Sequence, residues 1–386
     1  MRKRITLLLQ QLKVHSIIES RKAGRALLFL LVLSLASFVS GAKLTRTHRV
    51  TLDEGVLFKA PSGIAVYKNK VLVSDISRCI LFAFSLDSGR LLTEFGREGI
   101  GPNEFTMPNI RDMADGVIAV TNLGISKNYF YSFNDKSNKF SFHHRNNSGG
   151  TVVDLKILGR GEYLVNTLSD VNKRDGRAYV MTKLSDKGEK QYLLDIDKSF
   201  GEKTHVFGGN GPNDLTILSL PRYNVCCFNT NYFMYHWAGN LNPVIFDRTH
   251  NKRVDIKLKP SNKYRKPQNY RDIERAMQKR DMDLYWQEMG KYSWVVFNFL
   301  ADRTIGVVYA NYSAKRDVWL FQVALFSLSG ELLCENELRG IEEAGRLDWP
   351  GVYFFQRAEK KLYGLSHEMG EDNEDRYSII SYQVSE

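Results

Sequence analysis

The residues of this chain best suited to bind a ligand or an ion are polar side chains that end short apolar runs. Residues 71–75 (VLVSD) are one example, and five similar runs follow along the chain. Carboxylates, amide oxygens and imidazoles are the groups that coordinate metal ions and bind polar ligands. The six candidate site residues are Asp75, Asn122, Asn166, His236, Asn311 and His367.

Each candidate occupies the same place in a repeated pattern. A strand-like run precedes it and another follows it, as residues 61–67 (PSGIAVY) and 80–86 (ILFAFSL) do for Asp75. The first five units then add a fourth run, such as 91–96 (LLTEFG). Apolar runs that are separated by Gly, Asp and Ser are typical of antiparallel strands and their turns. The pattern therefore predicts six sheets, most of them with four strands.

The sixth unit has no fourth run before Glu386, whereas a spare strand-like segment, residues 48–53 (HRVTLD), precedes the first unit. Circular closure explains both observations, because sheets repeated radially leave only short, protected edges. We therefore predict an all-β fold, a six-bladed β-propeller over residues 48–386 that is closed by an N-terminal strand in the last blade. A seven-bladed ring and a two-sheet sandwich are the alternatives.

Propeller topology would place the six candidates on one face. The loop between the second and third strands of a blade emerges beside the connection to the next blade, so the candidates would form a rim around the channel mouth. They either bind a ligand there or cap the strands. Two similar loops, GPNE at 101–104 and GPND at 211–214, belong to the same face, where Asn103 and Asn213 can bond to nearby backbone.

The first unit also carries a resemblance to known proteins. Residues 61–96 (PSGIAVYKNKVLVSDISRCILFAFSLDSGRLLTEFG), followed by GIGPNEFTMP, resemble an NHL-type repeat. The segment is similar to those of secreted bacterial six-bladed propellers, the NHL-like and TolB-like proteins. The resemblance covers about one blade and, through the GPND loop, part of another. It implies a propeller fold but no single activity, because propellers serve as binding proteins, scaffolds and enzymes.

The N-terminal segment indicates export. Ala26–Val39 (ALLFLLVLSLASFV) has no charge, follows basic residues and is shorter than the roughly 20 residues that cross a bilayer. Small residues follow at 40–42, so residues 1–41 are predicted to be a signal peptide, or else an uncleaved anchor that makes the only membrane contact. The protein would then lie in the periplasm, at the cell surface or in the medium. This segment also holds seven basic residues and one acidic residue, over half of the net charge of +11, so nucleic acid is not an expected partner.

A helical insertion is predicted at residues 258–290, which are rich in charged residues and good helix formers. Apolar residues between Asn269 and Met289 recur mostly at offsets of three, four and seven, which indicates one amphipathic helix. Asn269 could cap its start, and Gly290 lies where it would end. The helix would either pack on the surface of the ring or cover the channel mouth as a lid.

Catalytic signatures are missing from the sequence, which contains no G-x-S-x-G, Walker, H-E-x-x-H or C-x-x-C motif. The four cysteines are interpreted as small buried apolar residues. His143 and His144 are neighbours on a presumed strand, so their side chains should face opposite sides and should not share a metal ion.

These observations favour an exported binding or scaffold protein over an enzyme. The expected partner is a glycan, a peptide or a protein of the cell envelope, bound on the face with the long loops. The protein is expected to be a monomer and to need no cofactor. The alternative is a propeller enzyme, a lactone hydrolase or a lyase, with calcium or zinc in the channel. Asp75, His236 and His367 would be the candidate metal ligands.

Overall fold

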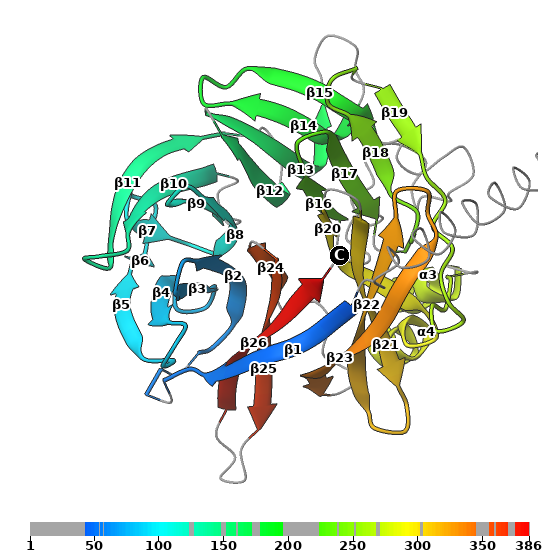
Figure 1. Ribbon diagram of the computed structural model, residues 1–386. Helices are drawn as coiled ribbons and strands as arrows, with labels where there is room; N and C mark the ends of the chain where they lie inside the picture. The colour runs from blue at the N-terminus through cyan, green and yellow to red at the C-terminus, as the bar shows by residue number, and fades with distance from the viewer. Residues whose placement is uncertain are drawn as a thin grey trace, which may run out of the picture. The chain divides into compact units, whose positions relative to one another are not determined.

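The computed structural model describes residues 43–385 apart from 54, 57, 123–126, 148–151, 160, 172–177, 196–223, 238, 251, 268–270, 302–303, 345–354, 359 and 370–374. In this part of the chain, six four-stranded antiparallel sheets follow one another around a central axis (Figure 1). We number them blades one to six in chain order.

The strands of a blade pair in sequence order, from the innermost to the outermost strand. Blade one holds β2 (Pro61–Tyr67), β3 (Lys70–Asp75), β4 (Ile80–Ser85) and β5 (Leu91–Phe95). Blade two holds β8 (Pro108–Ala114), β9 (Val117–Asn122), β10 (Lys127–Asn134) and β11 (Lys139–Asn146). Blade three holds β12 (Val152–Gly159), β13 (Glu162–Val171), β14 (Ala178–Ser185) and β15 (Lys190–Asp195).

The other three blades repeat this order. Blade four holds β16 (Asn224–Phe228), β17 (Tyr232–Trp237), β18 (Val244–Asp247) and β19 (Lys252–Asp255). Blade five holds β20 (Ser293–Leu300), β21 (Thr304–Ser313), β22 (Val318–Ser327) and β23 (Leu332–Ala344). Blade six holds β24 (Phe355–Ala358), β25 (Lys361–Met369), β26 (Asp375–Ser385) and, outermost, β1 (Lys43–Thr51).

The inner strands define the ring. β2, β8, β12, β16 and β20 contact one another in that order, and β24 contacts β2. Gly63 permits the approach of β2 to β8, because a Cβ atom there would lie 2.2 Å from the carbonyl oxygen of Ile110. The predicted six-bladed β-propeller is confirmed.

Closure of the ring by an N-terminal strand is also confirmed. β1 pairs antiparallel with β26, with Val50 opposite Ile379 and Lys43 opposite Ser385. The strand begins five residues earlier than the predicted start at residue 48. Thr45 to His48 are exposed, so their sequence lacks the apolar alternation that marks a half-buried strand.

The core lies between the blades, because alternate residues of each strand face the two neighbouring sheets. In blade one, Leu72 and Leu81 pack into the cluster shared with blade two, whereas Phe82 and Phe84 pack into the cluster shared with blade six. All four are fully buried. Each such side chain contributes about 1.5 to 3 kcal/mol relative to an exposed one.

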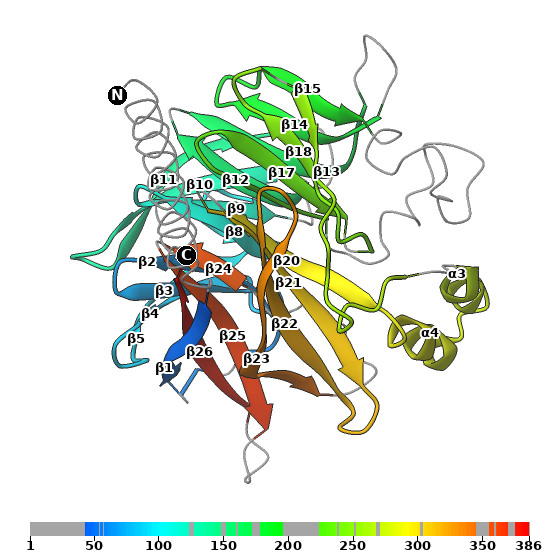
Figure 2. The same ribbon diagram turned by 45° about the vertical axis from the view of Figure 1, so that its right-hand side comes forward.

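The insertion holds two short helices, α3 (Arg271–Gln278) and α4 (Met282–Met289), where one helix was predicted (Figure 2). The break has a local cause: Arg280 has a φ of 55°, and Asp281 caps α4 by accepting a hydrogen bond from the backbone N–H of Leu284. Gly290 ends α4 as predicted, while Asn269 lies outside the described residues.

α4 is attached to blade five. The indole N–H of Trp294, in β20, donates to the carbonyl oxygen of Met289 at 2.8 Å. A Cβ atom on Gly290 would lie 2.9 Å from the ring of Tyr312, in β21. These contacts agree with the surface-packed alternative. In the described part of the chain, no helix has the length and apolar character needed to span a membrane.

Candidate functional site

All six sequence candidates lie in the second strand of a blade; five lie at or near its end, whereas Asn166 lies in the middle of β13. The residues opposite them begin the inner strands: Asp75 pairs with Pro61, Asn122 with Pro108 and Asn311 with Ser293. The candidates therefore mark the end of the ring at which the inner strands start.

Asp75 is fully buried and serves the backbone around it. Its carboxylate accepts hydrogen bonds from the N–H groups of Lys59 and Ala60, which lead into β2. It also accepts from Ser77 and Arg78, which follow β3. One side chain thus fixes two loops, which agrees with the strand-capping alternative.

Asn122 does the same in blade two. Its side-chain oxygen accepts from the backbone N–H groups of Thr106 and Met107 at 3.1 and 3.0 Å, and from the Thr106 hydroxyl at 2.7 Å. In the GPNE loop before them, the Glu104 carboxylate binds Arg97 and the N–H of Gly101, while Asn103 is exposed. The second such loop, with Asn213, lies outside the described residues.

Asn311 is also held by hydrogen bonds within the fold, whereas the side-chain oxygen and nitrogen of Asn166 have no hydrogen-bond partner among the described residues. Asn311 accepts from the Ser293 hydroxyl at 2.5 Å and donates to the carbonyl oxygen of Lys263 at 3.2 Å, which ties the insertion to blade five. Asn166 is fully buried in β13, opposite Asp154.

The two histidines differ in exposure. His367 is partly exposed: its Nε2 lies 2.6 Å from a carboxylate oxygen of Asp375, and its ring stacks on Tyr377. His236 is fully buried: its Nε2 lies 2.9 Å from the carbonyl oxygen of Leu241, and its Nδ1 lies 2.9 Å from the side-chain nitrogen of Asn298. A neutral ring that donates from Nε2 and accepts at Nδ1 satisfies both contacts. The role of all six residues in ligand binding stays a prediction.

His236 should make the stability of the fold fall in mild acid. Burial lowers its pKa from 6.5 to about 4. Above pH 6.5 the ring is neutral in both states, but between pH 6.5 and 4 only the unfolded chain takes up the proton. The free energy of unfolding should therefore fall by about 3 kcal/mol across this window. Urea denaturation at pH 7, 5.5 and 4 measures it.

The matched comparison is His236→Asn against His250→Asn. His236→Asn should be less stable at pH 7, but its free energy of unfolding should no longer show the fall between pH 6.5 and 4. The second should keep it, because His250 is exposed. Equal pH dependence in the wild-type chain and His236→Asn would contradict the assignment.

A cavity of about 270 Å³ lies in the central channel, against inner strands of five blades. The cavity is lined by the last four residues of β8, the last four residues of β20 and the last two residues of β16. It is therefore nearer the far ends of the inner strands than to the ends that Asp75 and Asn122 hold. The lining residues are Ile64, Arg111, Asp112, Met113, Ala114, Lys156, Ile157, Cys227, Phe228, Phe297, Asn298, Phe299 and Leu300.

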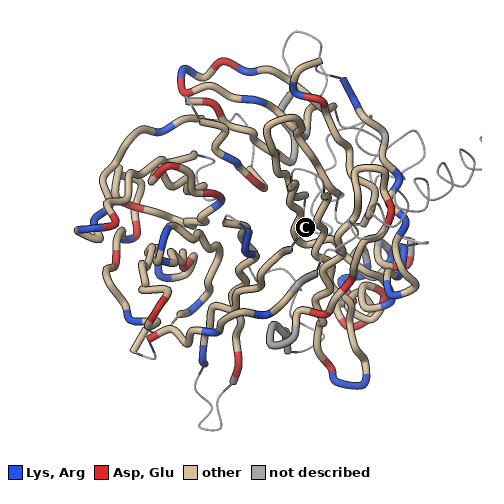
Figure 3. Tube along the Cα trace, in the orientation of Figure 1, with Lys and Arg blue, Asp and Glu red and all other residues tan. Residues whose placement is uncertain are grey.

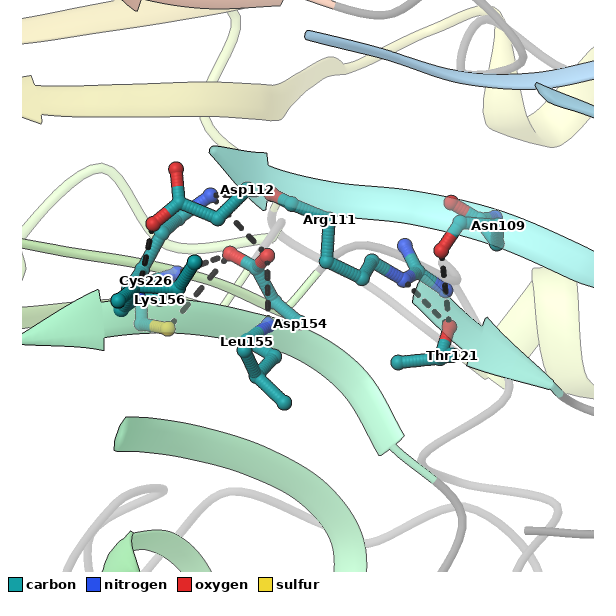
Figure 4. A network of polar contacts seen from close by, with 9 residues as sticks. Asn109, Arg111, Asp112, Thr121, Asp154, Leu155, Lys156 and Cys226 are labelled. Atoms are coloured by element: carbon teal, nitrogen blue, oxygen red, sulfur yellow. Dashed lines mark hydrogen bonds and ion pairs between the residues drawn. The ribbon is translucent and has the colours of Figure 1, made fainter. Parts of the chain in front are cut away.

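One wall of this cavity carries a charged network that links three blades (Figure 4). Lys156 lies 3.2 Å from a carboxylate oxygen of Asp154 and donates to the carbonyl oxygen of Arg111. Asp154 also accepts from the N–H of Cys226, at 3.0 Å. Asp112 accepts from the N–H of Ile157, at 2.7 Å.

Burial sets the electrostatics of this wall. It raises the pKa of the Asp112 carboxyl, an effect that the charge of Lys156 opposes. Burial also disfavours the Lys156 ammonium, yet the nearby Asp154 and Asp112 carboxylates raise the pKa of Lys156 above its ordinary value. The pKa of Lys156 and the pKa of the Asp112 carboxyl beside it are therefore both raised.

Sequence reasoning missed Arg111, Asp112 and Lys156. A signal was present, because these charges interrupt inner strands that are otherwise apolar, in PNIRDMA and VVDLKILG. Charged residues are rarely buried unless they are paired or functional. Elsewhere, Figure 3 shows charges of both signs spread over the blades of the described chain.

Comparisons with known proteins agree on the fold. Residues 50–135 match the model of a family described as a 6-bladed beta-propeller. A protein of Bacteroides fragilis described as a "Putative exported protein" has a TM-score of 0.52 at 11% identity, covering 89% of this chain and 96% of that one.

A PQQ-bound aldose sugar dehydrogenase of Streptomyces coelicolor has a TM-score of 0.45 at 11% identity, covering 89% and 98% of the two chains. No curated protein sequence matches. The chain is thus a six-bladed β-propeller, similar over residues 50–135 to that family and similar in fold to the Bacteroides protein.

Proposed function

We propose that this chain is an extracytoplasmic binding protein that holds a small acidic ligand, or the acidic end of a peptide, in its central channel. The observation that carries the proposal is the channel cavity, in which Arg111, Lys156 and Asp112 lie among apolar side chains. The signal-like segment at residues 1–41 and the fold of the Bacteroides protein support the location.

The cavity has the chemistry of a selective small-ligand site. Ligand pockets are mostly apolar, with a few polar groups that orient the ligand, and they usually hold about 300 to 1,000 Å³. At about 270 Å³ this cavity suits a small molecule or the end of a larger one. Phe297 and Phe299 offer an apolar wall. The Nε of Arg111 donates to the Thr121 hydroxyl at 3.1 Å, which positions its guanidinium, a group that recognises carboxylates. A glycan or an envelope protein would instead contact the rim.

The enzyme alternative would need a metal ion at the predicted rim residues. The Asp75 carboxylate serves four backbone N–H groups, and both ring nitrogens of His236 have partners inside the protein. Their commitment to the fold supports binding over metal-dependent catalysis.

Arg111→Gln should weaken ligand binding at least tenfold. The substitution keeps a polar side chain in the wall but removes the charge and the two-pronged donor geometry. A panel of small carboxylic acids and short peptides is first screened by thermal shift, and the Kd of each hit is then measured by calorimetry. Arg90→Gln is the matched control, because Arg90 is exposed on the turn before β5.

If the folded Arg111→Gln variant bound the ligand with unchanged affinity, the channel would not be the binding site. If the affinity of the same hit instead fell in a variant of His367, the partly exposed rim residue, the ligand would be assigned to the rim.

A further inference from the structure

The outer strand of blade two contains a β-bulge that the sequence did not reveal. In the pairing of β10 with β11, Phe130 lies opposite His144 but Tyr131 lies opposite Phe142, so His143 is an extra residue. A bulge alters the alternation of side chains between the two faces of a strand. The expectation that His143 and His144 face apart is therefore wrong: their Nδ1 atoms are 2.5 Å apart.

His144 is held firmly in this position. Its ring stacks on Phe130 with a centroid distance of 4.3 Å and an interplanar angle of 6°. Its Nε2 lies 2.7 Å from the hydroxyl of Tyr163, in blade three. When the ring hydrogen is on Nε2 and bonds to Tyr163, the lone pair of Nδ1 points at His143.

Both rings are suited to act as neutral ligands. Metal ions bind the neutral imidazole, and an Nε2–H of His144 that donates to Tyr163 leaves the lone pair on its Nδ1. His143 is exposed on the strand, so it can rotate and place its own ring hydrogen on the outer nitrogen. The neighbouring hydroxyl of Tyr163 resembles the hydrogen-bonding partners that commonly orient metal-bound histidines.

We propose that His143 and His144 bind a divalent transition-metal ion through their two Nδ1 atoms, at a surface site outside the central channel. Metal–nitrogen bonds of about 2.0 to 2.1 Å require the two nitrogens to separate to about 3 Å. A small rotation of the exposed His143 provides this change. Water completes the coordination shell, because no set of three or more His, Cys, Asp or Glu side chains in the described residues is arranged to hold a metal.

The site should prefer Cu²⁺ over Zn²⁺ and Ni²⁺, since imidazole sites follow the general order of divalent-metal affinity. Two ligands make a weak, exchangeable site rather than a structural one. Without a metal ion, a single N–H···N hydrogen bond joins the rings of His143 and His144.

The test is a titration of the untagged full-length chain with CuCl₂ and ZnCl₂, followed by calorimetry. His143→Asn and His144→Asn should each weaken Cu²⁺ binding at least tenfold, and Tyr163→Phe should weaken it about tenfold through lost orientation. His250→Asn is the control, because His250 is an exposed histidine whose Nδ1 pairs with Asp247. It should leave the strongest Cu²⁺ site unchanged.

A second readout separates ligation from folding. The electron paramagnetic resonance spectrum of the Cu²⁺-loaded chain should show coupling to two imidazole nitrogens, and either histidine variant should lose one of them. His143→Asn is expected to fold normally because its side chain is exposed. If this folded variant keeps the wild-type affinity and spectrum, or if the wild-type chain shows no saturable binding, the proposal is overturned.

Discussion

Asp75→Ala should lower the free energy of unfolding by roughly 3 to 5 kcal/mol. The variant leaves the backbone N–H groups of Lys59, Ala60, Ser77 and Arg78 without the carboxylate that they all donate to. A hydrogen bond to a charged group contributes about 1.5 to 3 kcal/mol, and the four losses are not fully additive, because water can replace the carboxylate at the exposed Lys59 and Ser77. Equilibrium unfolding in guanidinium chloride measures the change.

Two variants sharpen this experiment. Asp75→Asn keeps one oxygen acceptor and should lose less than half as much stability as the alanine variant. Asp87→Ala removes an exposed carboxylate from a surface turn and should change stability by less than about 0.5 kcal/mol. If Asp75→Ala proved as stable as the wild-type chain but failed to bind a ligand that the wild-type chain binds, Asp75 would be a rim binding residue and its capping role would be secondary.

The sequence predicted the blades well because each strand carries its own signal. Strands in the core between two sheets are apolar on both faces, and Gly, Asp and Ser mark the turns, as in residues 61–95. The outermost strand of blade six was predicted only in part, since Thr45 to His48 face solvent. The break between α3 and α4 depends on the backbone of Arg280, which the apolar pattern does not encode.

The candidate site was harder to predict because repetition marks structural and functional residues alike. Asp75 and Asn122 hold the segments that enter their blades, and such a structural role looks the same in a sequence as a ligand rim. The channel network depends on neighbours that are distant in sequence: Asp154 contacts Cys226, and Asp112 contacts Ile157. The histidine pair depends on a bulge in one strand, which moves a side chain without changing its sequence pattern.

Removal of β1 should abolish cooperative folding. A chain that begins at Lys43 keeps the strand, whereas a chain that begins at Leu52 loses all of its pairing with β26. The edge of β26 would then be open and its buried residues Ile379 and Val384 would lose their cover. The loss of a whole strand from a closed ring should be comparable to the total stability of a domain, about 5 to 15 kcal/mol. Circular dichroism during thermal unfolding compares the two chains.

Point variants test the same closure without removing residues. Val50 is buried and pairs with Ile379, so Val50→Asp buries a charge on β1 and should cost several kcal/mol. Thr45→Asp introduces the same charge on the exposed part of β1 and should cost little. If the chain that begins at Leu52 unfolded cooperatively at the temperature of the longer chain, β1 would be an accessory edge strand rather than the element that closes the ring.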